Sequence, residues 1–174
     1  MDTNNELRRD AESLTRVLVQ MARVIQLRDR DRVCRCAPEI TVSQCYGLSA
    51  IVEGGSLSVN ELAAELLLDK STVSRLANQL EAKGLVSKAA DPVDRRGVRL
   101  EATLEGRRLA GRVNEVMVDE NALILSDFDP EVRHGMLQLA SRLTRVLGDA
   151  VSVEAGCCSV VPLHTSRPAT EDVA

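Results

Sequence analysis

The chain has 174 residues, of which 44% are hydrophobic and 28% charged, a composition typical of one globular domain rather than of a disordered segment. No apolar run approaches the roughly 18 residues that a membrane span requires, and no secretory signal opens the sequence, so we expect a cytoplasmic protein that contacts no membrane. A net charge of −4 argues against a uniformly basic nucleic-acid binder, and the scarcity of aromatic residues argues against a platform that stacks single-stranded bases.

The N-terminal segment has apolar residues at spacings of three and four between Leu14 and Ile25, which predicts an amphipathic helix over about residues 5–30. A charged, cysteine-bearing segment comes next and closes with Pro38. We expect this segment to follow the helix rather than to continue it.

Three shorter helices come next. The first opens with a capping box at Thr41 and ends at two consecutive glycines. The second opens with another capping box at Ser58 and ends near Leu67. Asp69 caps the third helix, and Gly84 terminates it.

The hydrophobic period changes to two over residues 85–90 and 98–102, which flank the turn-rich segment 91–97. This pattern predicts a small β-hairpin. Beyond the hairpin, Thr103 starts a long helix that reaches about residue 126.

A last helix is expected from the N-cap Asp129, followed by Pro130, to about Val151. Its apolar residues recur on one face, which we expect to point inward: Val132, Met136, Leu139, Leu143, Val146 and Leu147. The tail beyond this helix lacks periodicity and is predicted to be irregular.

Two short helices joined by a tight turn and followed by a hairpin form a winged helix-turn-helix, a motif that binds duplex DNA. Residues 70–99 contain seven basic and three acidic side chains, so positive charge is concentrated there. The second helix offers hydroxyls and donors to phosphates and base edges: Lys70, Ser71, Thr72, Ser74, Arg75 and Asn78. At the hairpin tip, Arg95 and Arg96 are expected to reach a minor groove, and Asp94 to orient one of them.

The sequence therefore predicts a mainly α-helical fold with a small β-hairpin wing. The terminal helices carry more apolar surface than one domain of this size easily buries, so we expect a homodimer. Four parts follow one another: an N-terminal dimerisation helix with the first cysteines (1–40), a winged helix-turn-helix DNA-binding lobe (41–103), C-terminal dimerisation helices (104–152) and a cysteine-containing irregular tail (153–174).

Residues 58–106 resemble the DNA-binding core of the MarR family of bacterial transcription regulators, and the flanking helices extend this resemblance to about residues 5–150. The D-x-R wing motif of that family is matched from Asp94 to Arg96, and its T-x-x-G helix start is matched by Thr103 and Gly106. The resemblance implies a two-fold dimer that needs no cofactor to bind double-stranded DNA at a pseudo-palindromic operator, with half-sites about one helical turn apart. Leu67 departs from the family pattern, which has glycine at this turn. We expect Leu67 either to adopt a strained turn, at a cost of about 1 kcal/mol, or to reshape the turn.

Two other functional classes compete with a DNA-binding regulator. Winged helices also serve as protein-interaction modules, but the wing arginines favour DNA, since folding does not require arginine at these positions. An enzyme is not expected, because neither His134 nor His164 has the spacing of a catalytic set.

Five cysteines lie in two clusters: Cys34, Cys36 and Cys45, then Cys157 and Cys158. The resemblance implies that these clusters meet at the base of the dimer. Nearby arginines are expected to lower the thiol pKa values: Arg30, Arg32 and Arg35. The leading hypothesis is a repressor that leaves its operator when three or more of these thiolates bind a thiophilic metal or metalloid, arsenite-like or mercuric.

Alternatives remain for both the effector and the thiols. Oxidation of a thiol to a disulfide would release DNA in the same way. A small organic ligand, common in the resembled family, could bind a cleft between the dimer base and the DNA-binding lobe, although the scarcity of aromatic residues disfavours it. Cys45 could also be core, because a buried cysteine packs as a small hydrophobe.

Overall fold

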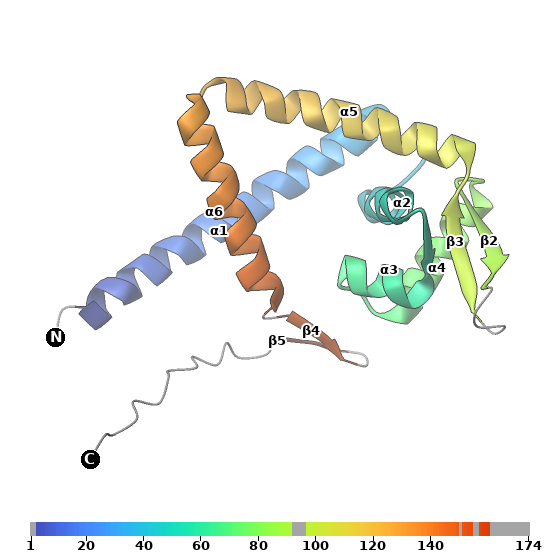
Figure 1. Ribbon diagram of the computed structural model, residues 1–174, viewed down its shortest axis with the longest axis horizontal. Helices are drawn as coiled ribbons and strands as arrows, with labels where there is room; N and C mark the ends of the chain where they lie inside the picture. Colours follow the sequence, from blue (N-terminus) through green and yellow to red (C-terminus); the bar gives the residue numbers. More distant parts are fainter. Residues whose placement is uncertain (1–2, 92–96, 150, 155–156, 161–174) are drawn as a thin grey trace, which may run out of the picture.

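The computed structural model describes residues 3–91, 97–149, 151–154 and 157–160 (Figure 1). Its elements in chain order are α1 (Thr3–Cys36), α2 (Val42–Gly54), β1 (Ser56–Ser58), α3 (Val59–Leu66), α4 (Lys70–Ala82), β2 (Val86–Ala90), β3 (Val98–Ala102), α5 (Leu104–Ser126), α6 (Pro130–Asp149), β4 (Val151–Glu154) and β5 (Cys157–Val160). Figure 1 shows a lobe built from α2, α3, α4 and the first sheet, beside the long helices α1, α5 and α6. No helix of the described ranges is long and apolar enough to cross a membrane.

Local capping starts the three short helices where the sequence predicts. The side chains of Thr41 and Ser58 each accept a hydrogen bond from the backbone N–H three residues later, and Gln44 and Glu61 bond back to the cap. The carboxylate of Asp69 caps α4 in a similar way. These helix starts are confirmed, because each cap satisfies N–H groups that have no partner inside the helix.

The core of the lobe fixes α4 against its neighbours. Its fully buried side chains come from α2, α3, α4, the sheet and α5: Leu48, Ile51, Leu62, Val73, Leu80, Val86, Leu100 and Leu109. Burial of each such side chain contributes about 1.5–3 kcal/mol. The buried side of α4 therefore packs in the core of the lobe, and the opposite side of the helix faces solvent.

The first sheet has three strands in the order β1-β3-β2, with both neighbouring pairs antiparallel. The predicted hairpin of β2 and β3 is confirmed, but β1 was not predicted. It comprises only Ser56–Ser58, between a glycine pair and a helix cap, and so offers no measurable alternation. Its register with β3, in which Leu57 faces Leu100, ties the wing to the start of α3.

The first helix is longer than predicted and ends at Cys36 rather than near residue 30. The charged segment remains helical because its side chains pair with one another: Arg32 with Asp29 at 2.7 Å and Arg35 with Asp31 at 2.9 Å. Cys34 and Cys36 are thus helical residues and do not lie in a loop.

The predicted α6 exists, but its apolar face does not point into the chain. Its side chains Val132, Leu139, Val146 and Leu147 are 44–70% exposed. On α1, apolar side chains from Leu7 to Leu27 are also exposed. The prediction of inward residues is therefore wrong for a single chain, which leaves two apolar helix faces in contact with solvent.

The tail is not irregular throughout, as the sequence had suggested. Residues 151–154 and 157–160 form β4 and β5, an antiparallel pair in which Val153 lies opposite Cys158 and Glu154 opposite Cys157. The strands were missed because each has only four residues. Val151–Glu154 alternates apolar and polar side chains, but Cys157–Val160 does not. The rest of the predicted tail lies outside the described residues.

Candidate nucleic-acid interface and an adjoining cavity

The turn before α4 combines a strained residue with a strong cap. Leu67 ends α3 in the left-handed conformation at φ 52° and ψ 42°, and its N–H donates to the carbonyls of Ala63 and Ala64. Asp69 then accepts hydrogen bonds from the Ser71 hydroxyl at 2.6 Å and from the Thr72 hydroxyl at 2.6 Å. These bonds hold the pKa of the Asp69 carboxyl well below its usual range. The strained turn predicted at Leu67 is present.

The residues predicted to contact DNA occupy the outer side of α4, but they are not equally free. Lys70 and Arg75 are exposed and form no ion pair within the described ranges. Ser71 and Thr72 are engaged in the Asp69 cap, and Thr72 also accepts a bond from Arg75 at 3.4 Å. Ser74 is half-buried.

Other polar groups of this region have structural partners. Lys88 donates to Glu81 at 2.6 Å and also to the Asn78 side chain, so Asn78 is linked to β2. Arg99 donates to Glu61 at 2.9 Å and to the Ser56 hydroxyl at 3.2 Å. Arg99 therefore joins β3 to β1 and α3, and the positive charge left unpaired on α4 comes from Lys70 and Arg75.

The wing tip, with Asp94, Arg95 and Arg96, lies outside the described residues. Its base is described: the N–H of Asp91 donates to the Gly97 carbonyl at 3.0 Å, directly beyond the last β2–β3 pair. The predicted arginines thus belong to a short connection closed at its base by a hydrogen bond. Their roles remain predictions.

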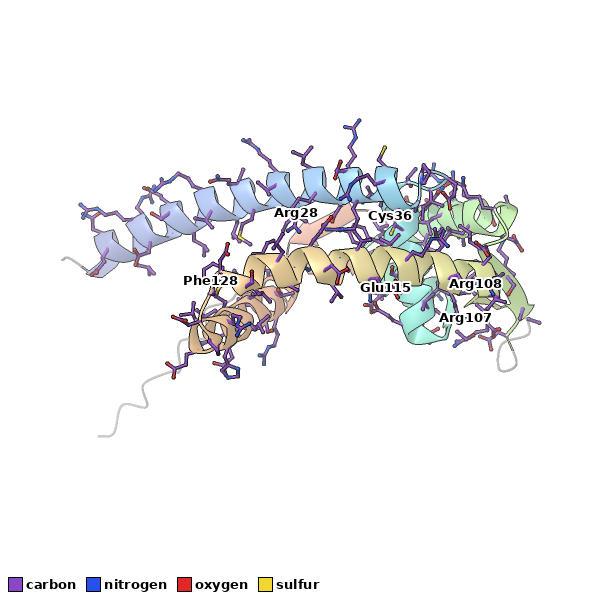
Figure 2. All side chains as sticks on the ribbon, turned by 90° about the horizontal axis from the view of Figure 1, so that it is seen from above. Arg28, Cys36, Arg107, Arg108, Glu115 and Phe128 are labelled. Carbon is purple, nitrogen blue, oxygen red and sulfur yellow. The ribbon has the colours of Figure 1, made fainter. Side chains whose placement is uncertain are left out.

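Ionic side chains connect α5 with the C-terminal part of α1, where the two helices approach each other (Figure 1 and Figure 2). Glu120 of α5 accepts from Arg32 at 2.9 Å and from Arg35 at 2.7 Å, while Arg28 approaches it at 3.4 Å. The arginine hydrogen bonds, that from Arg35 first, lower the pKa of Glu120 to about 2. Sequence reasoning did not find this cluster, because nothing local couples α1 to a position some ninety residues later.

Tyr46 links α2 to the same cluster. Its hydroxyl donates to the carboxylate of Asp29, which is itself buried and paired with Arg32. Burial first, and then the Asp29 hydrogen bond, raise the pKa of Tyr46 to about 12. A continuous set of contacts therefore runs from α2 through α1 to α5.

Two cavities flank Tyr46. The first, of about 420 Å³, lies among α1, α2 and α5, and its lining includes Asp29, Cys45, Arg107 and Met117. The second, also about 420 Å³, lies between α2 and α3, and its lining includes Glu65 and Leu68. The first matches the cleft expected between the long helices and the lobe.

The described cysteines do not form the predicted thiol set. Cys34 is exposed, Cys36 is half-buried and Cys45 is buried, and no three potential ligands come together as a metal site in the described ranges. Burial raises the pKa of the Cys45 thiol, and Arg32 offsets this only in part, so the expected lowering is wrong at this position. In one chain, the strand bearing Cys157 and Cys158 lies far from the C-terminal end of α1 (Figure 1).

Comparison with known proteins finds the same family for the DNA-binding lobe. A sequence model of the MarR family matches residues 39–97. A MarR family protein from Bacillus stearothermophilus superposes with a TM-score of 0.72 at 26% identity, over 80% of this chain and 96% of that one. Over residues 39–97 the chain matches the MarR family. The predicted family resemblance is confirmed over those residues, and the predicted fold is confirmed, including the terminal helices.

Curated relatives of the chain are named as regulators. It is 32% identical over 96 residues to the HTH-type transcriptional regulator YsmB of Bacillus subtilis, covering 55% of this chain and 64% of YsmB. It is 29% identical over 115 residues to the HTH-type transcriptional repressor MdtR of the same organism, covering 66% of this chain and 72% of MdtR. The first match spans less than two thirds of its relative. Both relatives are named for the regulation of transcription, and neither is named for a catalysed reaction.

Proposed function

We propose that the chain is a homodimeric repressor that binds operator DNA with α4 and the wing. The observation that carries this proposal is the outer face of α4, where Lys70 and Arg75 are exposed, unpaired in the described ranges and close to the helix N-terminus. A helix N-terminus attracts phosphate, and arginine can contact two acceptors of a guanine at once. Residues 70–99 are basic in a chain of net charge −4, which fits attraction of DNA to one edge.

The proposed contacts divide into two groups. Lys70 and Arg75 carry the charged contacts of α4, with Ser71, Thr72, Ser74 and Asn78 along the same helix. Ser71 and Thr72 are already bonded to Asp69, and Asn78 is already bonded to Lys88. We therefore assign these three side chains chiefly to positioning α4 against the DNA phosphate backbone rather than to reading bases. The wing residues Asp94, Arg95 and Arg96 complete the proposed surface at the minor groove.

A second copy of the chain would cover the exposed apolar faces of α1 and α6. Exposed side chains such as Leu14, Val17 and Leu139 repeat along these helices at spacings that form apolar stripes. A two-fold dimer places two α4 helices in successive major grooves, which requires a pseudo-palindromic operator. In this proposal residues 41–103 read DNA, and residues 1–40 and 104–152 hold the dimer together.

The DNA proposal is tested by selecting sites from a random duplex library and then measuring affinity by fluorescence anisotropy. Arg75→Ala is expected to weaken binding by about 1–3 kcal/mol and to relax specificity at one base pair if it reads a guanine. Lys70→Ala should weaken binding to all sites and reduce the salt dependence. Arg112→Ala, an exposed arginine on α5, is the matched control. Unchanged affinity in both α4 variants would reject the assigned surface.

The effector is a finer part of the proposal. The first cavity supports an organic ligand, because its walls come from the long helices α1 and α5 and from α2 of the lobe. The alternative, a thiophilic metal or metalloid, needs the tail cysteines, Cys157 and Cys158, to join Cys34, Cys36 or Cys45 across the dimer. A thiol oxidised to a disulfide is the third candidate.

These effectors separate in one experiment on the reduced protein bound to DNA. Arsenite or mercuric ion would release DNA without oxidant if thiolates coordinate it, and Cys157→Ser with Cys158→Ser would abolish that response. Release by peroxide alone would indicate oxidation. Release of DNA by an organic ligand that persists after every cysteine is replaced would assign the response to the first cavity.

A further inference from the structure

The two cavities on either side of Tyr46 share part of their walls. Tyr46, Ser49 and Glu53 of α2 line both of them. The outward face of α2 therefore carries two adjoining compartments, one toward α1 and α5 and the other toward α3. A ligand longer than one compartment would pass the ring of Tyr46.

The second compartment has a distinct charge. Its charged side chains are Glu53 and Glu65, both exposed and neither in an ion pair within the described ranges, and its lining contains no basic residue. Ala50, Leu66 and Leu68 supply an apolar wall beside them. Two carboxylates at an apolar cavity disfavour an anion and favour a cation that also has hydrocarbon to bury.

We propose that the second compartment binds the head group of a lipophilic organic cation, an amine or quaternary ammonium, whose apolar remainder extends into the first compartment. Glu53 and Glu65 offset the charge, and the ring of Tyr46 at the boundary offers a cation–π contact. The binding proposal stands on the cavities alone. Its regulatory consequence rests on the proposed function.

The second compartment also adjoins the turn that places α4. Leu66 and Leu68 line it, and between them Leu67 holds the left-handed backbone that links α3 to α4. A head group seated against these leucines would displace the turn, and with it the α4 surface. We therefore expect the cation to lower DNA affinity.

Binding is measurable at one site, because Tyr46 is the chain's single tyrosine and the chain contains no tryptophan. Titration of the full-length protein with 4-phenylbutyltrimethylammonium should change tyrosine emission saturably, with calorimetry giving the same dissociation constant. The anion 5-phenylpentanoate, of similar length, should bind at least tenfold more weakly. Equal or tighter binding of the anion would overturn the proposal.

Charge-neutral variants test the two carboxylates directly. Glu53→Gln and Glu65→Gln are each expected to weaken cation binding by about three- to tenfold, in line with a charged contact at a partly exposed site. Glu115→Gln is the control, since Glu115 is an exposed glutamate of α5 that lines neither cavity (Figure 2). A cation affinity unchanged in both cavity variants would mean apolar binding alone and would reject the proposal.

The DNA assay separates this inference from the proposed function. Normal operator binding with no cation signal at Tyr46 would refute the inference and leave the regulator intact. A saturable cation signal without binding to any duplex would refute the regulator and keep the site. If both hold, addition of the cation should reduce operator affinity, and Glu65→Gln should blunt this response.

Discussion

The hydroxyl of Tyr46 on α2 donates a hydrogen bond to the buried carboxylate of Asp29 on α1. Asp29 also pairs with Arg32, which reaches Glu120 on α5. A side chain of the winged lobe is thereby joined to the long helices α1 and α5 through charge-assisted hydrogen bonds, which are stronger than neutral ones. Movement of α1 against the lobe must break or stretch this contact.

This contact gives a spectroscopic prediction. Tyrosinate absorbance of the single tyrosine should appear with a pKa of about 12, above the ordinary value near 10. Asp29→Asn removes the adjacent charge and should lower this pKa, although burial will keep it above the ordinary value. Asp31→Asn, an exposed neighbour on the same helix, is the control. An ordinary pKa in the unmodified protein would contradict the contact.

The Glu120 cluster predicts a dependence of stability on acid. The folded pKa of Glu120, about 2, lies below its ordinary value of 4.5, so its contribution is complete above that value and is lost as pH falls toward 2. Glu120→Gln removes the group and should flatten this part of the curve. Urea unfolding between pH 6 and 3 measures the effect. A curve as steep in the variant as in the parent would assign the acid sensitivity elsewhere.

Prediction from sequence succeeded where the deciding interactions are local. The caps at Thr41, Ser58 and Asp69 involve partners within three residues, so the residue types at those spacings were enough to predict them. It failed where partners are remote or absent. The segment that extends α1 to Cys36 has ion pairs between residues three and four positions apart, but it is also held by the remote Glu120 of α5. The apolar stripe of α6 does not identify which surface covers it. The lining residues of the first cavity could not be predicted from the sequence, because they come from three helices that are far apart along the chain.

Gly106 predicts a steric effect. A Cβ at this position would lie 2.0 Å from the carbonyl oxygen of Leu85, which also accepts the Thr103 N–H. Gly106→Ala is therefore expected to destabilise the lobe by about 1–3 kcal/mol, the range for overpacking a tight site. On the same helix, Gly111→Ala meets nothing within 4 Å and should be neutral or stabilise by up to about 1 kcal/mol. Denaturant unfolding of both variants provides the comparison.

The left-handed Leu67 predicts a gain in stability on substitution. Leu67→Gly should raise the free energy of unfolding by about 0.5 kcal/mol, because relief of about 1 kcal/mol of strain exceeds the added entropy of the unfolded chain. The leucine is 45% exposed, so little burial is lost. The neighbouring Leu66 is half-buried and helical, so Leu66→Gly should instead lower the free energy of unfolding. If both variants lost stability equally, packing of Leu67 rather than backbone strain would dominate at the turn that orients α4.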